Sequence, residues 1–238
     1  PSSQAPSRAA QQAFEHCAAA GRDRAAKSRA SRGRSVRLVV GTAVSAERIT
    51  RVCGIPHSLD TMTTTKRDFM QAFVDTILKP RGWDYRMQFT GPTGTNAVEA
   101  AMKLARRVTG RNRIIAFTNG FHGMTLGSLA ATANAYFRNA AGVPLHYVDR
   151  LPFGHPLEGM EETYQDASSG YEAPAAILIE PIQAEGGVNV ADEAWLKEIR
   201  QFAKDRGALF IIDDIQAGCG RTGSYFSFDG MDLDPDII

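Results

Sequence analysis

Two adjacent carboxylates end a strongly apolar stretch near the end of the sequence. The run Ala208–Ile212 is wholly apolar, and Asp213 and Asp214 follow it directly, ahead of the glycine-rich turn IQAGCGRTG. A turn needs glycines, but it does not need acids at the end of a buried strand. A carboxylate held there could cap a helix, bind a metal or pair with a cation. The alternative is an exposed turn in which Arg221 pairs with the acids on the surface.

A second candidate is GPTGTNAVE, in which a glycine-rich turn leads into a helix. The free N–H groups and the positive dipole end at a helix N-terminus attract anions, so Gly94 and Thr95 are candidates for a phosphate site. No Lys follows Thr95, so the turn is not the nucleotide-binding phosphate loop. Asn96 is expected to cap the helix, with Glu99 as its capping-box partner. Ordinary turn residues at a helix entry would give the same pattern.

A third candidate is the pair Phe121-His122, which follows the predicted strand 113–118. An aromatic side chain in this position can stack on a flat ligand ring. A packed core aromatic beside a surface histidine is the alternative reading of the pair.

The three candidates together favour pyridoxal phosphate as the ligand. Its phosphate would lie at Gly94 and Thr95, and its ring would lie against Phe121. Asp213 would keep the pyridine nitrogen protonated, so that the ring can accept electrons, and Gln216 would bond to the ring hydroxyl. A metal site is not expected, because neither a His nor a further carboxylate is suitably spaced nearby.

Alternating strands and helices would position these residues. The sequence predicts helices over 66–80, 96–110 and 193–207 and strands over 85–90, 113–118, 175–180 and 208–213. Apolar strands separated by amphipathic helices are typical of an α/β fold, a mostly parallel sheet with helices on both faces. Ligands bind at the C-terminal ends of the strands in such sheets. Glu180 and Asp213 both follow strands, one βαβ unit apart, so we group them in one site.

The charge of the chain is unevenly distributed. Residues 1–54 hold ten Lys or Arg against three Asp or Glu, although the whole chain has a net charge of +1. Large apolar residues are scarce in this part, so residues 1–53 are expected to be a disordered or non-native segment, followed by a folded domain over 54–238. An RNA-binding arm or a transit peptide would share this composition. Binding of nucleic acid is not expected elsewhere.

Membrane and redox signals are weak. The apolar run Leu38–Val44 is too short to span a bilayer, and we expect no membrane association. Cys17, Cys53 and Cys219 form neither a disulfide framework nor a zinc motif. A reducing, cytoplasmic setting is therefore expected.

Four motifs resemble those of one known family. TGTNAVEAAMKLAR, FHGMTLGSLA, IEPIQAEGG and IIDDIQAGCGRTG are similar, in order and spacing, to motifs of the class III aminotransferases, over roughly 54–238. The resemblance implies the large domain of a fold-type I pyridoxal-phosphate-dependent transferase, here truncated. It also implies a homodimer or higher homo-oligomer with a small-molecule amino donor and acceptor.

The resemblance assigns roles residue by residue. It matches Gly94 and Thr95 to the residues that bind the phosphate, and Phe121, with His122 beside it, to the aromatic residue that stacks on the ring. Asp213 matches the acid at the pyridine nitrogen, and Gln216 matches the partner of the ring hydroxyl. Glu185 matches an acid at the substrate entrance that pairs with a gate arginine, and Glu180 matches a nearby acid. No lysine here matches the one that binds the cofactor covalently. That lysine is expected beyond Ile238, so the chain alone is expected to be inactive.

Within the family, the sequence resembles the diaminobutyrate branch. HSLDTMTTTKRDFMQAF is typical of it, and Asp214 and Ala217 stand where most members carry Glu and Thr. The branch implies amino transfer from L-glutamate to L-aspartate 4-semialdehyde, in ectoine biosynthesis. An ornithine- or 4-aminobutyrate-type aminotransferase, or a non-catalytic fragment, are the alternatives.

Overall fold

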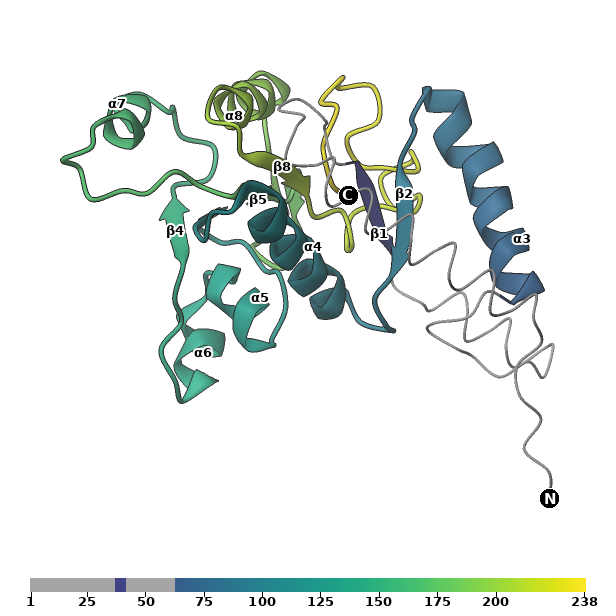
Figure 1. Cartoon of the computed structure of the whole chain (residues 1–238), viewed down its shortest axis with the longest axis horizontal. Coiled ribbons are helices and arrows are strands. Elements are labelled where there is room, and N and C mark those ends of the chain that lie inside the picture. The colour runs from purple at the N-terminus through teal and green to yellow at the C-terminus, as the bar shows by residue number, and fades with distance from the viewer. Residues whose placement is uncertain (1–36, 42–62) are drawn as a thin grey trace, which may run out of the picture. The chain divides into compact units, whose positions relative to one another are not determined.

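A parallel sheet lies at the centre of the described chain. The computed structural model describes residues 37–41 and 63–238. Strands β3 (Ile114–Phe117), β4 (Val148–Leu151), β5 (Ala176–Ile179) and β8 (Leu209–Ile212) pair in the order β4-β3-β5-β8, all parallel (Figure 1). Every residue of β3, β5 and β8 is buried, which explains their continuous apolar sequences. The predicted parallel sheet is confirmed.

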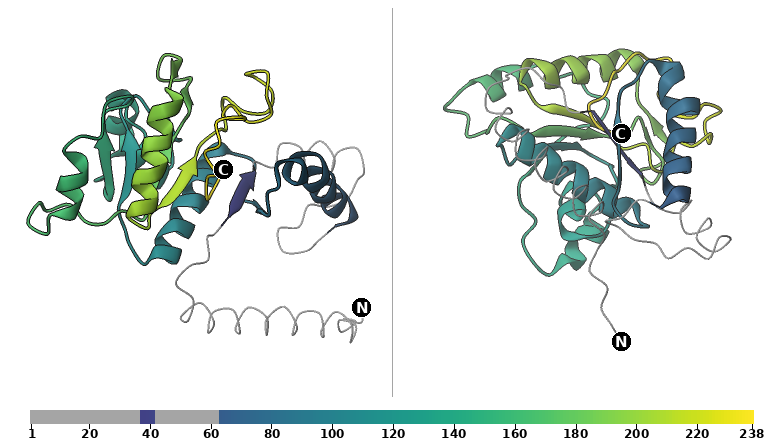
Figure 2. Two further views of the ribbon diagram at one scale, coloured as in Figure 1. Left: turned by 90° about the horizontal axis from the view of Figure 1, so that it is seen from above. Right: turned by 45° about the vertical axis from the view of Figure 1, so that its right-hand side comes forward.

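Two amphipathic helices cover opposite faces of this sheet. Helix α8 (Glu193–Asp205) packs Leu196, Ile199 and Phe202 against one set of strand side chains, and α4 (Gly94–Thr109) packs Met102 and Ala105 against the other. Successive strand residues contribute alternately to the two cores, as side chains on a pleated strand must. Figures 1 and 2 show the sheet between the two helices.

The first predicted helix also forms, but in three segments. Helix α3 (Thr64–Phe73) continues as the π-helical turn Val74–Leu78 and the 3-10 turn Lys79–Arg81, and Gly82 ends it with φ 69°. Strand β2 (Arg86–Phe89) follows and pairs in parallel with β1 (Leu38–Gly41). Strand β1 falls within the predicted basic segment 1–53; the rest of that segment, apart from Arg37, lies outside the described residues. The boundary at residue 53 stays a prediction.

The remaining elements are short. They are α5 (Leu126–Ala131), α6 (Ala135–Arg138), the 3-10 turn Asn139–Ala141, α7 (Met160–Gln165) and the antiparallel pair β6 (Ile182–Gln183) and β7 (Asn189–Val190). Arg138 and Arg150 both donate hydrogen bonds to the final carbonyls of α5, at Ala130 and Thr132 among others. Two cations therefore cap the C-terminus of this helix.

The C-terminal residues of the chain return to the sheet. Ile237 forms a parallel bridge with Ile211 of β8, and the Asp236 carboxylate accepts the N–H of Phe210 at 2.9 Å. The Asp234 carboxylate accepts two hydrogen bonds from the Arg37 guanidinium. These contacts fix residues 234–238 along the outer edge of β8. Among the described residues, no helix has the length and apolar character that a membrane span requires.

Candidate active site

Asp213 and His122 form a buried pair where β8 and β3 end. The Oδ2 atom of Asp213 lies 2.8 Å from Nδ1 of His122, and their side chains are 6% and 1% exposed. The N–H of Asp213 donates to Ile179 O at 2.8 Å, which extends the β5–β8 pairing by one residue. The sheet itself therefore fixes the position of the Asp213 carboxylate.

The environment of His122 favours its protonated form. Burial alone would lower the pKa of the imidazole, but the hydrogen bond and charge of Asp213, together with the charge of Glu180, outweigh burial and raise the pKa of His122. The backbone N–H of His122 donates to Thr132 Oγ1 at 2.9 Å, and Thr132 Oγ1 donates to Gly123 O at 3.0 Å. These bonds fix the loop on which the histidine lies.

Glu180 lies at the end of β5, beneath the same loop. Its side chain is buried, and its Oε2 atom accepts the N–H of Phe121 at 2.9 Å. Burial raises the pKa of Glu180 to about 7, against the opposing charge of His122, and the negative charge of Asp213 raises it further. The structure therefore brings the expected group of Glu180 and Asp213 together, with His122 as a third member.

The N-terminus of α4 begins with a different cap from the one predicted. Thr93 is the N-cap, and its hydroxyl accepts the N–H of Asn96 at 3.3 Å. The predicted Asn96 cap is wrong, because Asn96 already lies in the first turn of the helix. Glu99 does not complete a capping box either. Its Oε1 atom accepts instead from Thr125 Oγ1 at 2.6 Å and from Ser128 N at 3.0 Å, the donors at the start of α5.

Thr95 lies in a cluster of hydroxyl groups at this helix start. Its Oγ1 atom lies 2.8 Å from Thr125 Oγ1 and also bonds to Ser128 Oγ. The N–H of Thr125 donates to Thr95 Oγ1 at 3.3 Å. The side chain of Thr95 thus ties α4 to α5, so the backbone N–H groups of this turn are the donors that would hold a phosphate.

Two glycines permit close approach around the turn. A Cβ atom at Gly94 would lie 3.0 Å from Ile215 Cγ2, and one at Gly123, where φ is 123°, would lie 2.4 Å from Thr95 Oγ1. The loops after β3 and β8 therefore close on the start of α4 only because these side chains are absent. Ile215, whose N–H donates to Asp213 Oδ1 at 3.3 Å, was not among the predicted site residues. Its signal in the sequence is an apolar residue directly after two acids, and in the structure this residue is exposed.

Gln216 and Glu185 meet at the surface of the site. The Nε2 atom of Gln216 donates to Glu185 Oε1 at 3.0 Å. Glu185 also lines a cavity of about 330 Å³ together with Phe121, Phe137 and Arg150. The rings of Phe121 and Phe137 meet edge to face, with 5.3 Å between centroids. Glu185 is thus exposed and Glu180 is buried, although the sequence placed both near the substrate; their roles stay predictions.

The two acids at the end of β8 have different partners. The Asp214 carboxylate accepts from both the N–H and the hydroxyl of Ser227, and burial raises its pKa to about 6. It holds the loop 215–227 closed. Arg221 donates to Gly218 O at 3.0 Å, so the alternative of a surface turn in which Arg221 pairs with the acids is wrong.

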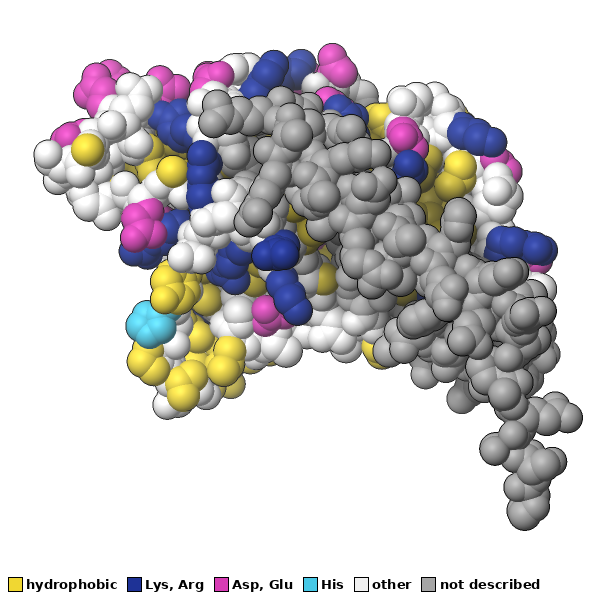
Figure 3. Space-filling model, viewed as in Figure 1, with side chains coloured by type: hydrophobic (Ala, Val, Ile, Leu, Met, Phe, Trp, Pro, Cys, Tyr) yellow, Lys and Arg dark blue, Asp and Glu magenta, His cyan; other side chains and the backbone are white. Residues whose placement is uncertain are grey.

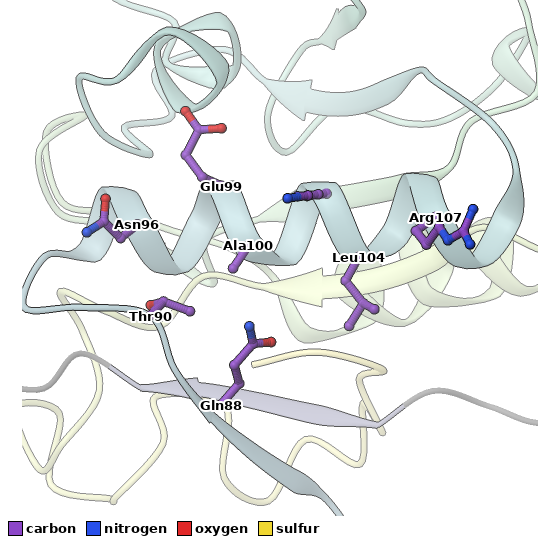
Figure 4. A pocket seen from close by; sticks show the side chains of 8 residues that line it. Gln88, Thr90, Asn96, Glu99, Ala100, Leu104 and Arg107 are labelled. Atoms are coloured by element: carbon purple, nitrogen blue, oxygen red, sulfur yellow. The ribbon is translucent and has the colours of Figure 1, made fainter. Parts of the chain in front are cut away.

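A larger cavity, of about 580 Å³, lies on the outer side of α4. Gln88 and Thr90 line it from the β2 segment, and Asn96, Leu104 and Arg107 line it from the helix (Figure 4). Asp213 and Phe121 do not line this cavity. It is therefore separate from the site at the strand ends.

The residues at the strand ends fit pyridoxal phosphate. Gly94 and Thr95 begin α4, whose first backbone N–H groups can bind a phosphate, and Asp213 supplies a fixed acid for a ring nitrogen. In the described ranges 37–41 and 63–238, no group of three or more His, Cys, Asp or Glu side chains could hold a metal ion.

A parallel sheet covered on both faces, with a helix N-terminus, an aromatic residue and a buried acid at its strand ends, is the arrangement of a pyridoxal-phosphate-dependent transferase of fold type I. The Aminotransferase class-III family model matches residues 56–238, and the chain belongs to this family. An amine transaminase from an uncultivated Pseudomonas species has the same fold, with a TM-score of 0.65 at 22% identity over 83% of this chain and 49% of that one.

Two curated relatives are about half identical to the chain. An uncharacterized aminotransferase, y4qG, from Sinorhizobium fredii is 50% identical over 81% of this chain and 45% of its own length. A diaminobutyrate–2-oxoglutarate transaminase from Halalkalibacterium halodurans is 52% identical over 78% of this chain and 45% of its own length. The chain thus spans about half the length of the curated relatives it matches.

Proposed function

We propose that the full-length protein transfers the amino group of L-glutamate to L-aspartate 4-semialdehyde. The products are L-2,4-diaminobutanoate and 2-oxoglutarate, and the reaction serves ectoine biosynthesis in the cytoplasm. The observation that carries the proposal is the buried Asp213–His122 pair at the end of β8. The substrate rests on relatives named diaminobutyrate–2-oxoglutarate transaminase, which include the one from Halalkalibacterium halodurans.

The bound cofactor supplies an electron sink for the carbon that loses a proton during amino transfer. Asp213 would hold a proton on the pyridine nitrogen, and His122 keeps that carboxylate oriented by its 2.8 Å hydrogen bond. The N–H groups at the start of α4 would bind the phosphate, and Phe121 would restrict the tilt of the ring. Gln216 would bond to the ring hydroxyl, and Glu185 would lie at the substrate entrance.

The test of Asp213 is its replacement by Asn in the full-length protein. We expect Asp213→Asn to lower kcat by about 100-fold or more, because the ring nitrogen loses its ionic partner. Asp84→Asn is the matched control, since Asp84 is an exposed acid that pairs with Arg86. Circular dichroism establishes that both variants fold. An Asp213→Asn enzyme as active as the control would refute the proposed role.

The test of the substrate is a comparison of amino acceptors with glutamate as donor. We expect the highest kcat/KM with L-aspartate 4-semialdehyde. Glutamate semialdehyde, the acceptor of ornithine-type enzymes, is one methylene longer, and succinate semialdehyde, the acceptor of 4-aminobutyrate-type enzymes, lacks the α-amino group. Both should react at least about tenfold less efficiently, because a pocket discriminates one methylene by about 1–3 kcal/mol and a missing amino group leaves its partners in the pocket unpaired. A preference for either of the other two would reject the assignment while keeping the aminotransferase.

We also propose that the protein is a homo-oligomer. Exposed apolar side chains gather over α5 and α6 (Figure 3). Leu126 of α5 and Tyr136 of α6 are exposed apolar residues, as is Met124 just before α5, and Tyr136 is 80% exposed. A patch of this kind is typical of an interface between subunits. Light scattering should give at least twice the mass of one chain, and Tyr136→Asp should reduce it; a monomer in both cases would contradict the proposal.

A further inference from the structure

Glu180 is a buried acid, and binding of substrate does not explain why it is buried. Only 5% of the residue is exposed, and its Oε2 atom already accepts the N–H of Phe121. An uncompensated carboxylate in such a place is costly, so its partners indicate its role. The hydrogen bond to Phe121 directs the carboxylate toward the loop that carries His122, away from solvent.

Gly120 brings the glutamate and the histidine together. The Cβ atom that another residue would carry at this position lies 3.1 Å from His122 Nε2 and 3.5 Å from Glu180 Oε2. Both polar atoms therefore approach the same point on the backbone. The imidazole has the Asp213 carboxylate at Nδ1 and the Glu180 carboxylate on its Nε2 side.

The charges around His122 favour an imidazolium. The carboxylate of Asp213 at the end of β8 and, when ionised, that of Glu180 at the end of β5 stabilise a positive charge on His122, while Arg150 on β4 opposes it. The Thr132 hydroxyl from the end of α5 accepts the backbone N–H of His122 and does not bond to the ring. An imidazolium is stabilised by both neighbouring carboxylates, whereas a neutral ring leaves the charges of Asp213 and Glu180 to repel each other.

We propose that Glu180 is a positioning residue that keeps His122 protonated from behind the loop 119–123 and thereby keeps the Asp213 carboxylate paired with a cation and oriented toward the cofactor nitrogen. The consequence for Asp213 rests on the proposed function; the coupling of Glu180 to His122 does not. When the Glu180 charge is removed, His122 loses its proton more readily. The Asp213 carboxylate then has a neutral partner, which holds its orientation less firmly than an imidazolium does.

The experiment follows the His122 ring by nitrogen NMR, with neither cofactor nor substrate present. Protein labelled with ¹⁵N-histidine is titrated between about pH 5 and 9, and the loss of one signal set in His122→Asn identifies the ring. Glu180→Gln removes the charge but keeps an oxygen acceptor for the Phe121 N–H. Glu180→Asp keeps the charge. Glu185→Gln is the control, because it removes a nearby acid that is exposed and bonded to Gln216.

We expect Glu180→Gln to lower the pH at which His122 loses its proton, and Glu180→Asp and Glu185→Gln to lower it less. An unmoved titration in Glu180→Gln, or an equal shift in Glu185→Gln, would overturn the proposal. If Glu180→Gln does not fold, the folded Glu180→Asp variant must still lower the pH at which His122 loses its proton, by a smaller amount. An unchanged titration of His122 in Glu180→Asp would then overturn the proposal. If Glu180→Gln shifts the His122 titration as expected but the full-length protein does not catalyse transamination, the proposed function is rejected and the coupling of Glu180 to His122 is kept.

Discussion

Gly123 offers a direct test of how the site closes. It lies between the loop after β3 and the hydroxyl cluster, with φ at 123°. In Gly123→Ala, the new Cβ would lie 2.4 Å from Thr95 Oγ1, 2.6 Å from Thr95 Cβ and 2.8 Å from Ser128 Oγ. Real side chains do not approach so closely, so the start of α4 or the loop must move apart.

The expected loss of stability has two parts. A backbone conformation restricted to glycine costs about 1–3 kcal/mol for alanine. Overpacking against Thr95 and Ser128 adds about 1–3 kcal/mol. Gly223→Ala is the matched control, because Gly223 has φ 95° and nothing lies within 4 Å of its Cβ position. The control carries the backbone cost alone, so Gly123→Ala should lose about 1–3 kcal/mol more than Gly223→Ala.

Urea unfolding followed by tryptophan fluorescence measures both losses. The free energy of unfolding is obtained by linear extrapolation, and equal slopes establish that the two variants expose similar surface. In the full-length protein, Gly123→Ala should also weaken binding of pyridoxal phosphate, because Thr95 is displaced. Equal losses in the two variants would refute the argument, since the contact with Thr95 would then cost nothing.

Three further predictions concern stability. The folded-state pKa of Asp214 is about 6, above its ordinary value of 3.8. The stability that its neutral form contributes is therefore present near pH 4 and lost as the pH rises toward 6. This decline in the free energy of unfolding, measured by urea titrations at several pH values, should be smaller in Asp214→Asn by up to about 3 kcal/mol. Asp192 caps α8 through the N–H groups of Ala194 and Trp195, so Asp192→Ala should cost about 1 kcal/mol, and no change in the unfolding midpoint would contradict this. Phe202→Ala should cost about 3–5 kcal/mol in the same assay, because the ring is 1% exposed in the core; a loss below about 1 kcal/mol would show that the core collapses around the cavity.

The sequence predicted the elements whose pattern reflects burial. Strands β3, β5 and β8 and helix α8 all form where continuous or helical apolar spacing indicated them. The pairing of β1 with β2 was not predicted, since β1 is four residues long and lies among basic and small residues. The cap of α4 was predicted wrongly, because Thr93 and Asn96 are both suitable cap residues and only the path of the backbone selects Thr93.

The site was predicted in outline because parallel strands end at one edge of the sheet. That rule places the loops after β3, β5 and β8 together without any knowledge of side-chain contacts. It does not show that His122 pairs with Asp213 across 91 positions of sequence. Nor does it predict that Glu180 is buried and Glu185 is exposed, because the burial of each side chain depends on the side of the Phe121 loop on which it lies. These details arise from packing, which residue spacing does not encode.

The short helix α5 has charges at both ends, and this affects the mobility of the site. A six-residue helix is unstable alone in water. Glu99 lies at its positive end, and Arg138 and Arg150 lie at its negative end. Helix α5 is thus held at one end by Glu99 of α4 and at the other end by Arg150 of β4. The loop that carries Phe121 and His122 is hydrogen-bonded to Thr132 at the end of α5, so movement of this loop would break these bonds. We expect amide hydrogen exchange at the end of α5 and in that loop to speed up together in Arg150→Met.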